Sequence, residues 1–207
     1  FLLTTITSIL IARAVGPEGK GILALVYLAS GQAIGFLSLG IESAIIYYVG
    51  GGRIDKRTVS STALVLSLGL GTLAMGFMIA VLHFVLKQDS PVIWFLIYIF
   101  ALLSPVSLFL SYLNVIARAE GRIVELAGLT LVGRVLYTSA IVLCFFLFRS
   151  VPGILAAGLG TNIISTMIYL FFHARWGYLP PKLSLVSREV ARRLVAYGIK
   201  GHLGTIF

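Results

Sequence analysis

The apolar run Ile123–Phe148, IVELAGLTLVGRVLYTSAIVLCFFLF, decides the fold, because it is long enough to cross a bilayer and carries Arg134 near its middle. Eleven residues of the run precede Arg134 and fourteen follow it. At ~1.5 Å per helical residue, Arg134 lies about 17 Å from one end, near the midplane of a hydrocarbon core ~30 Å thick. A guanidinium there costs at least ~2.5 kcal/mol and remains charged. Arg134 therefore requires an anionic partner, a water-filled cavity, or both.

Two roles for Arg134 meet this requirement. It can form a structural ion pair with an acid on a neighbouring helix, or it can line a cavity that handles an anionic ligand, which is the role that we predict. Glu42 is the strongest candidate partner, since it lies roughly 11 Å deep at ~1.5 Å per residue. The surrounding Leu39–Ser43 is apolar or small, so the carboxylate is expected to face the bundle interior. There it would pair with Arg134, or take up and release a proton.

The composition indicates a membrane protein. Of the 207 residues, 59% are hydrophobic and only 11% are charged, whereas soluble domains contain about 25% charged residues. The formal net charge of +9 would suggest a nucleic-acid partner in a soluble protein. Here most basic residues fall between apolar runs, where they orient helices against a bilayer. We therefore expect the bilayer to be a partner, and nucleic acid not to be one.

Apolar runs alternate with short polar or glycine-rich connections along the chain. Each complete run exceeds the ~20 residues that cross a bilayer. We predict an all-α, polytopic membrane helix bundle: a six-helix lobe over 1–174 whose first helix is truncated, a cytoplasmic linker with an amphipathic stretch over 175–193, and the truncated start of a seventh helix over 194–207. The chain is expected to be an N-terminal fragment of a longer protein. The runs are 1–12, 22–49, 59–86, 92–116, 123–148 and 153–174, with another starting near residue 194.

Glycine and proline give three local predictions. Arg13–Gly21 contains three Gly and one Pro and should interrupt the helix between the first two runs. Pro105 should kink the fourth run, because it removes a backbone hydrogen bond and clashes with the preceding turn. Gly31 and Gly35, four residues apart, should let two helices pack closely.

The basic residues predict the orientation. The connections after the second, fourth and sixth runs hold ten Lys and Arg residues, and those on the other side hold four. The positive-inside rule places the more basic side in the cytoplasm. The chain is therefore expected to be a multi-pass protein of the inner (plasma) membrane with a cytoplasmic N-terminus. The ten are Arg53, Lys56, Arg57, Arg118, Arg122, Arg175, Lys182, Arg188, Arg192 and Arg193; the four are Arg13, Lys20, Lys87 and Arg149.

Four further polar residues within apolar runs are candidates for the site. Lys200 can reach the interface with its long side chain, or add a second positive charge to the cavity of Arg134. Asn114 and Asn162 can bond across helices or line the cavity. His202 lies in an incomplete run and is included with them as a possible cavity residue.

Enzyme signatures are absent from the sequence. Gly16–Lys20 resembles a phosphate-binding loop but lacks its spacing and a preceding strand. There is no HExxH, no CxxC and no pair of Asp-rich motifs that would chelate Mg²⁺. We therefore predict that the protein is not an enzyme and has no metal site and no cofactor.

Three stretches resemble one family of transporters. Ile11–Leu25, IARAVGPEGKGILAL, is similar to the first hairpin of the polysaccharide-transport branch of the multidrug/oligosaccharidyl-lipid/polysaccharide (MOP) exporters. Leu37–Ala44, LSLGIESA, resembles the end of that branch's helix two, and Val195–Lys200, VAYGIK, the opening of its helix seven. Ala14-Val15 replaces the usual Leu before the Gly. The resemblance covers the whole chain and favours the O-antigen flippase group.

The resemblance implies two six-helix lobes around a cavity that opens alternately to either side. The implied cargo is an undecaprenyl-diphosphate-linked oligosaccharide, moved from the inner to the outer leaflet for cell-surface polysaccharide and lipopolysaccharide synthesis. Arg134 and Lys200 would attract the diphosphate, and Glu42 would tune that charge or couple transport to H⁺ or Na⁺. Two alternatives remain: a cation-coupled drug antiporter, and a membrane glycosyltransferase or ligase acting on the same carrier. A structural scaffold is a further alternative.

Overall fold

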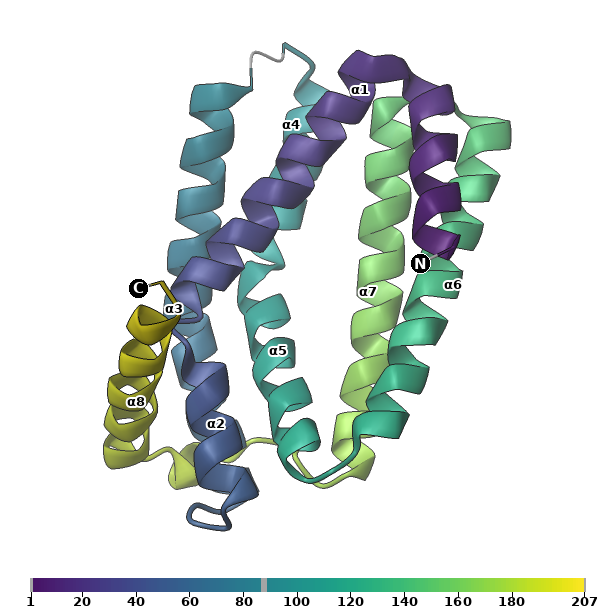
Figure 1. The fold of residues 1–207 in the computed structure, drawn as a ribbon. Helices are drawn as coiled ribbons and strands as arrows, with labels where there is room; N and C mark the ends of the chain where they lie inside the picture. Colours follow the sequence, from purple (N-terminus) through teal and green to yellow (C-terminus); the bar gives the residue numbers. More distant parts are fainter. Residues whose placement is uncertain (1, 87–88, 207) are drawn as a thin grey trace.

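The protein is described by a computed structural model, which gives the backbone of residues 2–86 and 89–206 and the side chains of residues 3–86 and 89–201. All regular elements in these residues are helices, so the predicted all-α bundle is confirmed (Figure 1). The helices are α1 (Leu2–Leu37), α2 (Ile41–Gly50), α3 (Lys56–Val85), α4 (Pro91–Leu102), α5 (Ser104–Ala119), α6 (Ile123–Leu147), α7 (Val151–Arg175), the 3₁₀ turn η1 (Leu183–Leu185) and α8 (Arg188–Ile206).

Within the described residues, five helical segments are long and apolar enough to cross a membrane. From Lys56 onward, successive spanning segments run in opposite directions. The helices α2, α5 and α7 all end at the lower end of the bundle in Figure 1. The basic connections predicted to lie on one side therefore do lie together. The segments are Leu3–Leu37, Lys56–Val85, Pro91–Ala119, Ile123–Leu147 and Val151–Arg175.

The first segment consists of two arms that meet at Gly16. Figure 1 shows one arm rising to the upper end and the second descending from it. Within α1, Gly16 has non-helical dihedrals, with φ of 70° and ψ of −176°. Glycine tolerates this φ, and the fixed φ of Pro17 suits the first turn of the second arm. The predicted break within Arg13–Gly21 is confirmed, and it is confined to Gly16, with helical residues on both sides.

The second apolar run is not one helix, contrary to the sequence-based prediction. It is broken between α1 and α2, where Leu39 and Gly40 have φ values of 50° and 66°. Gly198 of α8 packs against this break, since a Cβ at that position would lie 2.6 Å from the Leu39 carbonyl oxygen. Tyr112 of α5 donates a hydrogen bond to the Ser38 carbonyl at 3.4 Å. The break is therefore partly covered by α5 and α8.

Pro105, where the sequence predicted a kink, lies in the first turn of α5, and the fourth run divides into α4 and α5 just before it. Its ring packs against Gly71 of α3, where an added Cβ would lie 2.8 Å from the Pro105 nitrogen. Gly31 and Gly35 have no such neighbour within 4 Å among the described residues. The prediction of close packing at that pair is therefore wrong, and Gly71 has that role.

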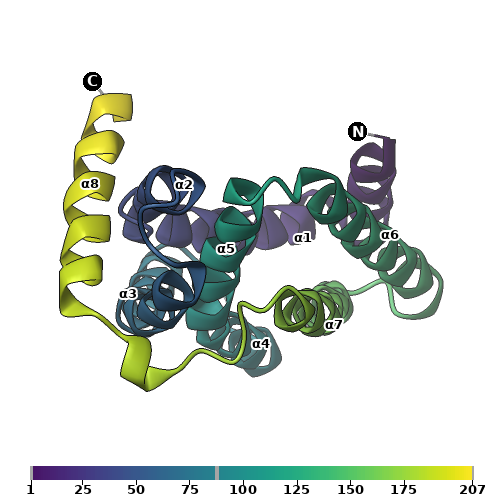
Figure 2. The same cartoon turned by 90° about the horizontal axis from the view of Figure 1, so that it is seen from below.

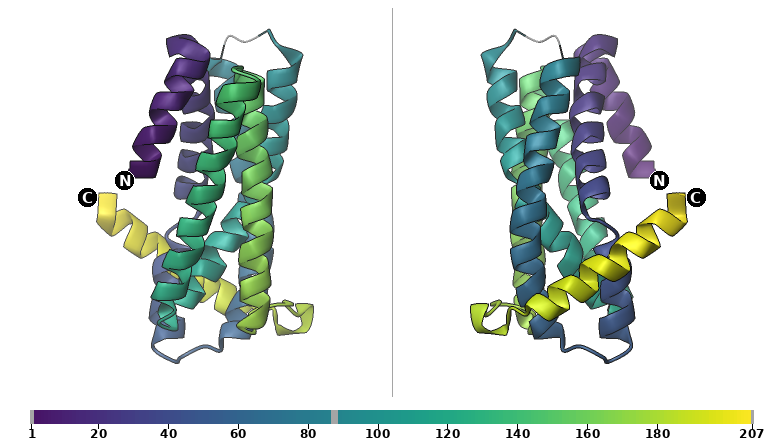
Figure 3. Two further views of the ribbon diagram at one scale, coloured as in Figure 1. Left: turned by 90° about the vertical axis from the view of Figure 1, so that its right-hand side faces the viewer. Right: turned by 90° about the vertical axis from the view of Figure 1, so that its left-hand side faces the viewer.

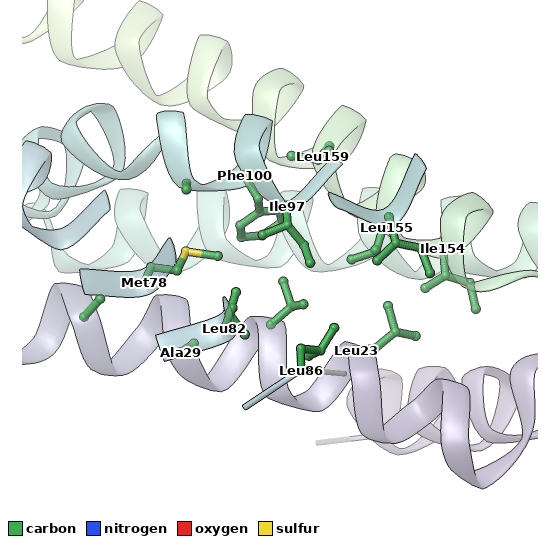
Figure 4. Packing of buried hydrophobic residues seen from close by; sticks show 14 of the residues in the cluster. Leu23, Ala29, Met78, Leu82, Leu86, Ile97, Phe100, Ile154, Leu155 and Leu159 are labelled. Carbon is green, nitrogen blue, oxygen red and sulfur yellow. The ribbon is translucent and has the colours of Figure 1, made fainter. Parts of the chain in front are cut away.

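Two apolar clusters hold the helices together. The upper one joins α1, α3, α4 and α7 and includes Met78, Ile97 and Leu155 (Figure 4). The lower one joins α2, α3 and α5, and includes Ile45 and Leu113, each fully buried. Because α5 contributes to the lower cluster and lies at the centre of the view in Figure 2, it is the central helix of the lower half of the bundle.

The segment between α7 and α8 is tied to the first turns of α3 by three consecutive hydroxyl residues. The Ser60 hydroxyl donates to the Tyr178 carbonyl at 2.9 Å. The Ser61 and Thr62 hydroxyls accept from the backbone nitrogens of Lys182 and Ser187 at 3.0 and 3.3 Å. After this segment, α8 is one helix across the predicted amphipathic stretch and the predicted start of helix seven. It runs obliquely across the outside of the bundle (Figure 3).

Glu120, just after α5, joins the same region electrostatically. Its carboxylate is 2.8 Å from Lys56 Nζ and accepts a hydrogen bond from the Tyr178 hydroxyl at 2.6 Å. Burial raises the pKa of the Glu120 carboxyl, but hydrogen bonds from Lys56 and Tyr178, and the charges of Lys56 and Arg122, outweigh burial and hold the pKa below its ordinary value of 4.5. Glu120 is therefore ionised at neutral pH and stabilises the docked segment.

Gly71→Val should destabilise the protein by about 1–3 kcal/mol, because the new side chain would overpack against the Pro105 backbone. Gly69→Val is the matched control, since Gly69 lies on the same helix and has no neighbour within 4 Å. Thermal unfolding of both variants in detergent measures the difference. Equal melting temperatures for the two would contradict the packing of α3 against Pro105.

Docking of residues 178–187 should depend on pH through Glu120. Because its folded pKa lies below the ordinary value of 4.5, its stabilising contribution is fully present at neutral pH and is lost as pH falls below 4.5 through the folded pKa. Amide-exchange protection factors for residues 178–187, corrected for intrinsic rates, should fall over that interval. In Glu120→Gln the same factors should be lower at pH 7 and nearly flat with pH. An unchanged pH profile in that variant would exclude Glu120 as the cause.

Candidate functional site

A cavity of about 480 Å³ lies between α1, α4, α5, α6 and α7, which Figure 2 shows from below. Among the described side chains, its lining contains hydroxyl, amide and phenol groups and no charged group. A volume in the range of about 300–1,000 Å³ is typical of small-ligand pockets. The polar lining residues are Tyr27, Ser107, Ser111, Asn114, Tyr137, Thr161, Asn162, Ser165, Thr166 and Tyr169.

Helical periodicity explains why these residues meet. On α5, Ser107, Ser111 and Asn114 follow one another at spacings of four and three and share one face. On α7, Asn162, Ser165, Thr166 and Tyr169 repeat the same pattern. The structure thus brings Asn114 and Asn162, both predicted as possible cavity residues, to one cavity. The hydroxyl residues were missed, although a polar stripe within an apolar run was the signal that could have identified them.

Tyr27 of α1 enters the cavity wall because Gly158 of α7 leaves room for it. A Cβ at Gly158 would lie 2.5 Å from the Tyr27 hydroxyl oxygen. The Tyr137 hydroxyl is 3.5 Å from the same oxygen. Tyr169 lies 3.1 Å from the Thr130 hydroxyl of α6. Three phenols are therefore fixed around the polar stripe.

Arg134 lies beside this cavity, on an exposed face of α6. Its Nη1 donates to the Thr4 hydroxyl at 2.9 Å. The guanidinium lines a hollow of about 390 Å³ that shares Gly133, Tyr137 and Tyr169 with the main cavity. Among the described side chains, no carboxylate lies within 4.0 Å of it. Arg134 is thus charged and paired with a neutral hydroxyl.

The predicted pair of Glu42 and Arg134 is wrong. Glu42 accepts a hydrogen bond from the Ser111 hydroxyl at 2.5 Å. It lies in the first turn of α2, which packs against α5 and α8, whereas α6 packs mainly against α1 and α7. Because α5 stands between α2 and α6 (Figure 2), it separates the two charges. Glu42 therefore lies behind the cavity wall and reaches the cavity through Ser111.

The amide of Asn114 likewise contacts a side chain that lies outside the cavity lining. Its Oδ1 lies 3.0 Å from Nε2 of His173 on α7. The His173 side chain is fully buried, and its Nδ1 has no hydrogen-bond partner. Tyr169, Trp176 and Tyr178 surround the imidazole, with ring centroids 5.2 to 6.3 Å away. No sequence motif indicated the His173 contact, because 59 residues separate it from Asn114.

Lys200 is exposed on α8, which packs against α2 and α3 on the side of the bundle away from α6 (Figures 1 and 2). The structure therefore does not bring Lys200 and Arg134 into one site. The His202 side chain lies outside the described residues. No group of three or more His, Cys, Asp or Glu residues that could hold a metal ion occurs in the described part of the chain.

Further hollows extend the site along α6. One of about 260 Å³ contains Arg118 and shares Asn114 and Tyr169 with the main cavity. Another, of about 220 Å³, contains Lys20 and shares Thr4 with the hollow of Arg134. Basic side chains therefore occur below, beside and above the neutral cavity, where each can attract an anion.

Comparison with known proteins identifies the family. No curated protein and no solved structure matches this chain. A family model described as polysaccharide biosynthesis protein matches residues 1–207. The match agrees with the all-α membrane bundle and with the resemblance of the first hairpin to polysaccharide transporters. The chain belongs to this polysaccharide biosynthesis protein family, the polysaccharide-transport branch of the MOP exporters.

Proposed function

We propose that the protein is a flippase that moves a diphosphate-linked oligosaccharide on a polyprenyl carrier between the two leaflets of a membrane. Family membership supports a polysaccharide-related membrane transporter. The observation that carries the finer proposal is an Arg134 guanidinium in the middle of a spanning helix, next to a neutral cavity rich in hydroxyl groups. One ligand that would use both is an anionic diphosphate joined to a neutral sugar.

The surroundings of Arg134 fit a diphosphate better than a structural ion pair. A charge within a bilayer needs a counter-charge or water, and Arg134 has only the Thr4 hydroxyl as hydrogen-bond acceptor among the described residues. Guanidinium groups bind phosphate oxygens through paired, charge-assisted hydrogen bonds. We infer that the diphosphate supplies the missing counter-charge when substrate binds.

The basic residues support a direction of movement. The lower end of the bundle carries the connections rich in Lys and Arg, which the positive-inside rule places in the cytoplasm. The hollow with Arg118 lies toward that end and adjoins the main cavity. In the proposed inner (plasma) membrane orientation, Arg118 would meet the diphosphate at the inner leaflet and Arg134 would receive it next. Alternating access with the proposed second lobe would complete the transfer, without chemistry on the substrate.

The arrangement of Glu42 disfavours a drug antiporter. An antiporter of cations needs an acid that meets its cargo directly, whereas the Glu42 carboxylate is turned to Ser111 and does not line the main cavity. Coupling to H⁺ or Na⁺ is retained as part of the proposal. A glycosyltransferase or ligase would need catalytic acids or a base within the cavity, whose lining is neutral.

Arg134→Gln should lower transport by about 10- to 100-fold, because a charge-assisted contact of about 1.5–3 kcal/mol is lost. The measurement is the appearance of fluorescent undecaprenyl-diphosphate oligosaccharide in the opposite leaflet of liposomes that contain the full-length protein. Arg13→Gln, which removes an exposed charge at the upper end, is the matched control and should transport normally. Equal rates for Arg134→Gln and wild type would contradict the diphosphate site, and no transport by wild type would contradict the flippase.

A further inference from the structure

We propose that the neutral cavity is a saccharide subsite, in which Ser111 and Asn114 form an acceptor–donor pair for neighbouring sugar hydroxyls and Glu42 and His173 act behind them as positioning residues. The inference deepens the proposed function and rests on it, because it assigns the glycan and the diphosphate of one substrate to separate places. The first step in the argument is the direction of each hydrogen bond behind the cavity wall.

Ser111 is fixed as an acceptor. Its hydroxyl has one proton, and that proton is donated to the Glu42 carboxylate at 2.5 Å. Because the Glu42 oxygen accepts this proton, the proton is not available to a ligand. The oxygen of Ser111, which lines the cavity, therefore has its lone pairs left for a ligand hydroxyl.

Asn114 is fixed as a donor. A neutral His173 carries one N–H, and Nδ1 is buried without a partner. An orphaned buried N–H is rarer in proteins than an under-satisfied acceptor, so the proton belongs on Nε2, which then donates to Asn114 Oδ1 at 3.0 Å. This bond assigns the amide orientation and leaves the Asn114 NH₂ group for a ligand in the cavity.

The pair suits a sugar by spacing and by charge. Ser111 and Asn114 are three residues apart on α5, so their Cβ atoms are about 5–6 Å apart on one face. A sugar hydroxyl both donates and accepts, so two neighbouring hydroxyls can satisfy one acceptor and one donor together. The phenol rings of Tyr137 and Tyr169 are available for the apolar face of the ring, and both also line the hollow of Arg134. The glycan would therefore bind within reach of the diphosphate site.

The test compares three probes: the lipid-linked oligosaccharide pool extracted from producing cells, the free oligosaccharide that mild acid releases from that pool, and synthetic undecaprenyl diphosphate. Kd is measured for each with the full-length protein in nanodiscs. Asn114→Leu should weaken binding of the intact glycolipid by about tenfold, the effect of one lost hydrogen bond in a buried site, and leave that of undecaprenyl diphosphate unchanged. Gln32→Leu, which removes an exposed amide of α1 outside the cavity lining, should change neither.

The positioning residues are tested with matched pairs of variants. His173→Gln and Glu42→Gln each keep a group that can make the bond behind the wall, so both should retain the preference for the glycosylated lipid. His173→Leu and Glu42→Leu remove that group and should lose the preference by about the same tenfold. Loss of preference in Glu42→Gln would overturn the positioning role, because it would show that charge matters rather than the hydrogen bond.

The two proposals fail in different ways. If Asn114→Leu weakens both lipids equally, or neither, the saccharide subsite is wrong and the flippase proposal stands. If wild type binds neither lipid but binds the free oligosaccharide in a way that Asn114→Leu abolishes, the subsite stands and the lipid-linked substrate is wrong. If wild type binds none of the three probes, both proposals are overturned.

Discussion

The structure depends on the requirement that every polar group inside a bilayer finds a partner within the protein or in a water-filled cavity. This requirement explains why the polar side chains of α5 and α7 face one another rather than the lipid. It also explains the break before α2, where the Ser38 carbonyl accepts from Tyr112 and where α8 covers the backbone. Among the described residues, the Arg134 guanidinium has one neutral partner and no counter-charge, and it is therefore open to an anionic ligand.

Much of the fold could be predicted from the sequence, because bilayer thickness imposes a run length that hydropathy detects directly. The break at Gly16 and the division at Pro105 follow from backbone chemistry that these two residues cannot avoid. The break at Leu39 could not be predicted in this way. Leucine rarely adopts a positive φ, and hydropathy continues unchanged across it. The backbone of Leu39 packs closely against Gly198. Because Gly198 is distant in sequence, this contact cannot be predicted from the residues around Leu39.

The site was predictable in part for a similar reason. The depth of Arg134 could be read from its position in an apolar run, and Asn114 and Asn162 stood out as amides among apolar residues. Contacts between side chains on different helices could not be predicted from the sequence, because they depend on the order in which the helices surround α5. Glu42 and Arg134 had suitable depth and charge, yet α5 lies between their helices. The bonds from Glu42 to Ser111 and from His173 to Asn114 are tertiary contacts of this kind.

The account centres on the claim that Arg134 faces a hydrated site that receives an anionic substrate. Cysteine labelling tests it most directly, since Cys144 is the single cysteine of the chain and Cys144→Ala gives an unreactive background. In that background, Thr138→Cys, whose side chain lines the hollow of Arg134, should react with a membrane-impermeant thiol reagent, and lipid-linked oligosaccharide should protect it while Arg134 is intact. A thiol at position 138 that stays unreactive in the folded protein, or that reacts equally with and without the substrate, would contradict the account.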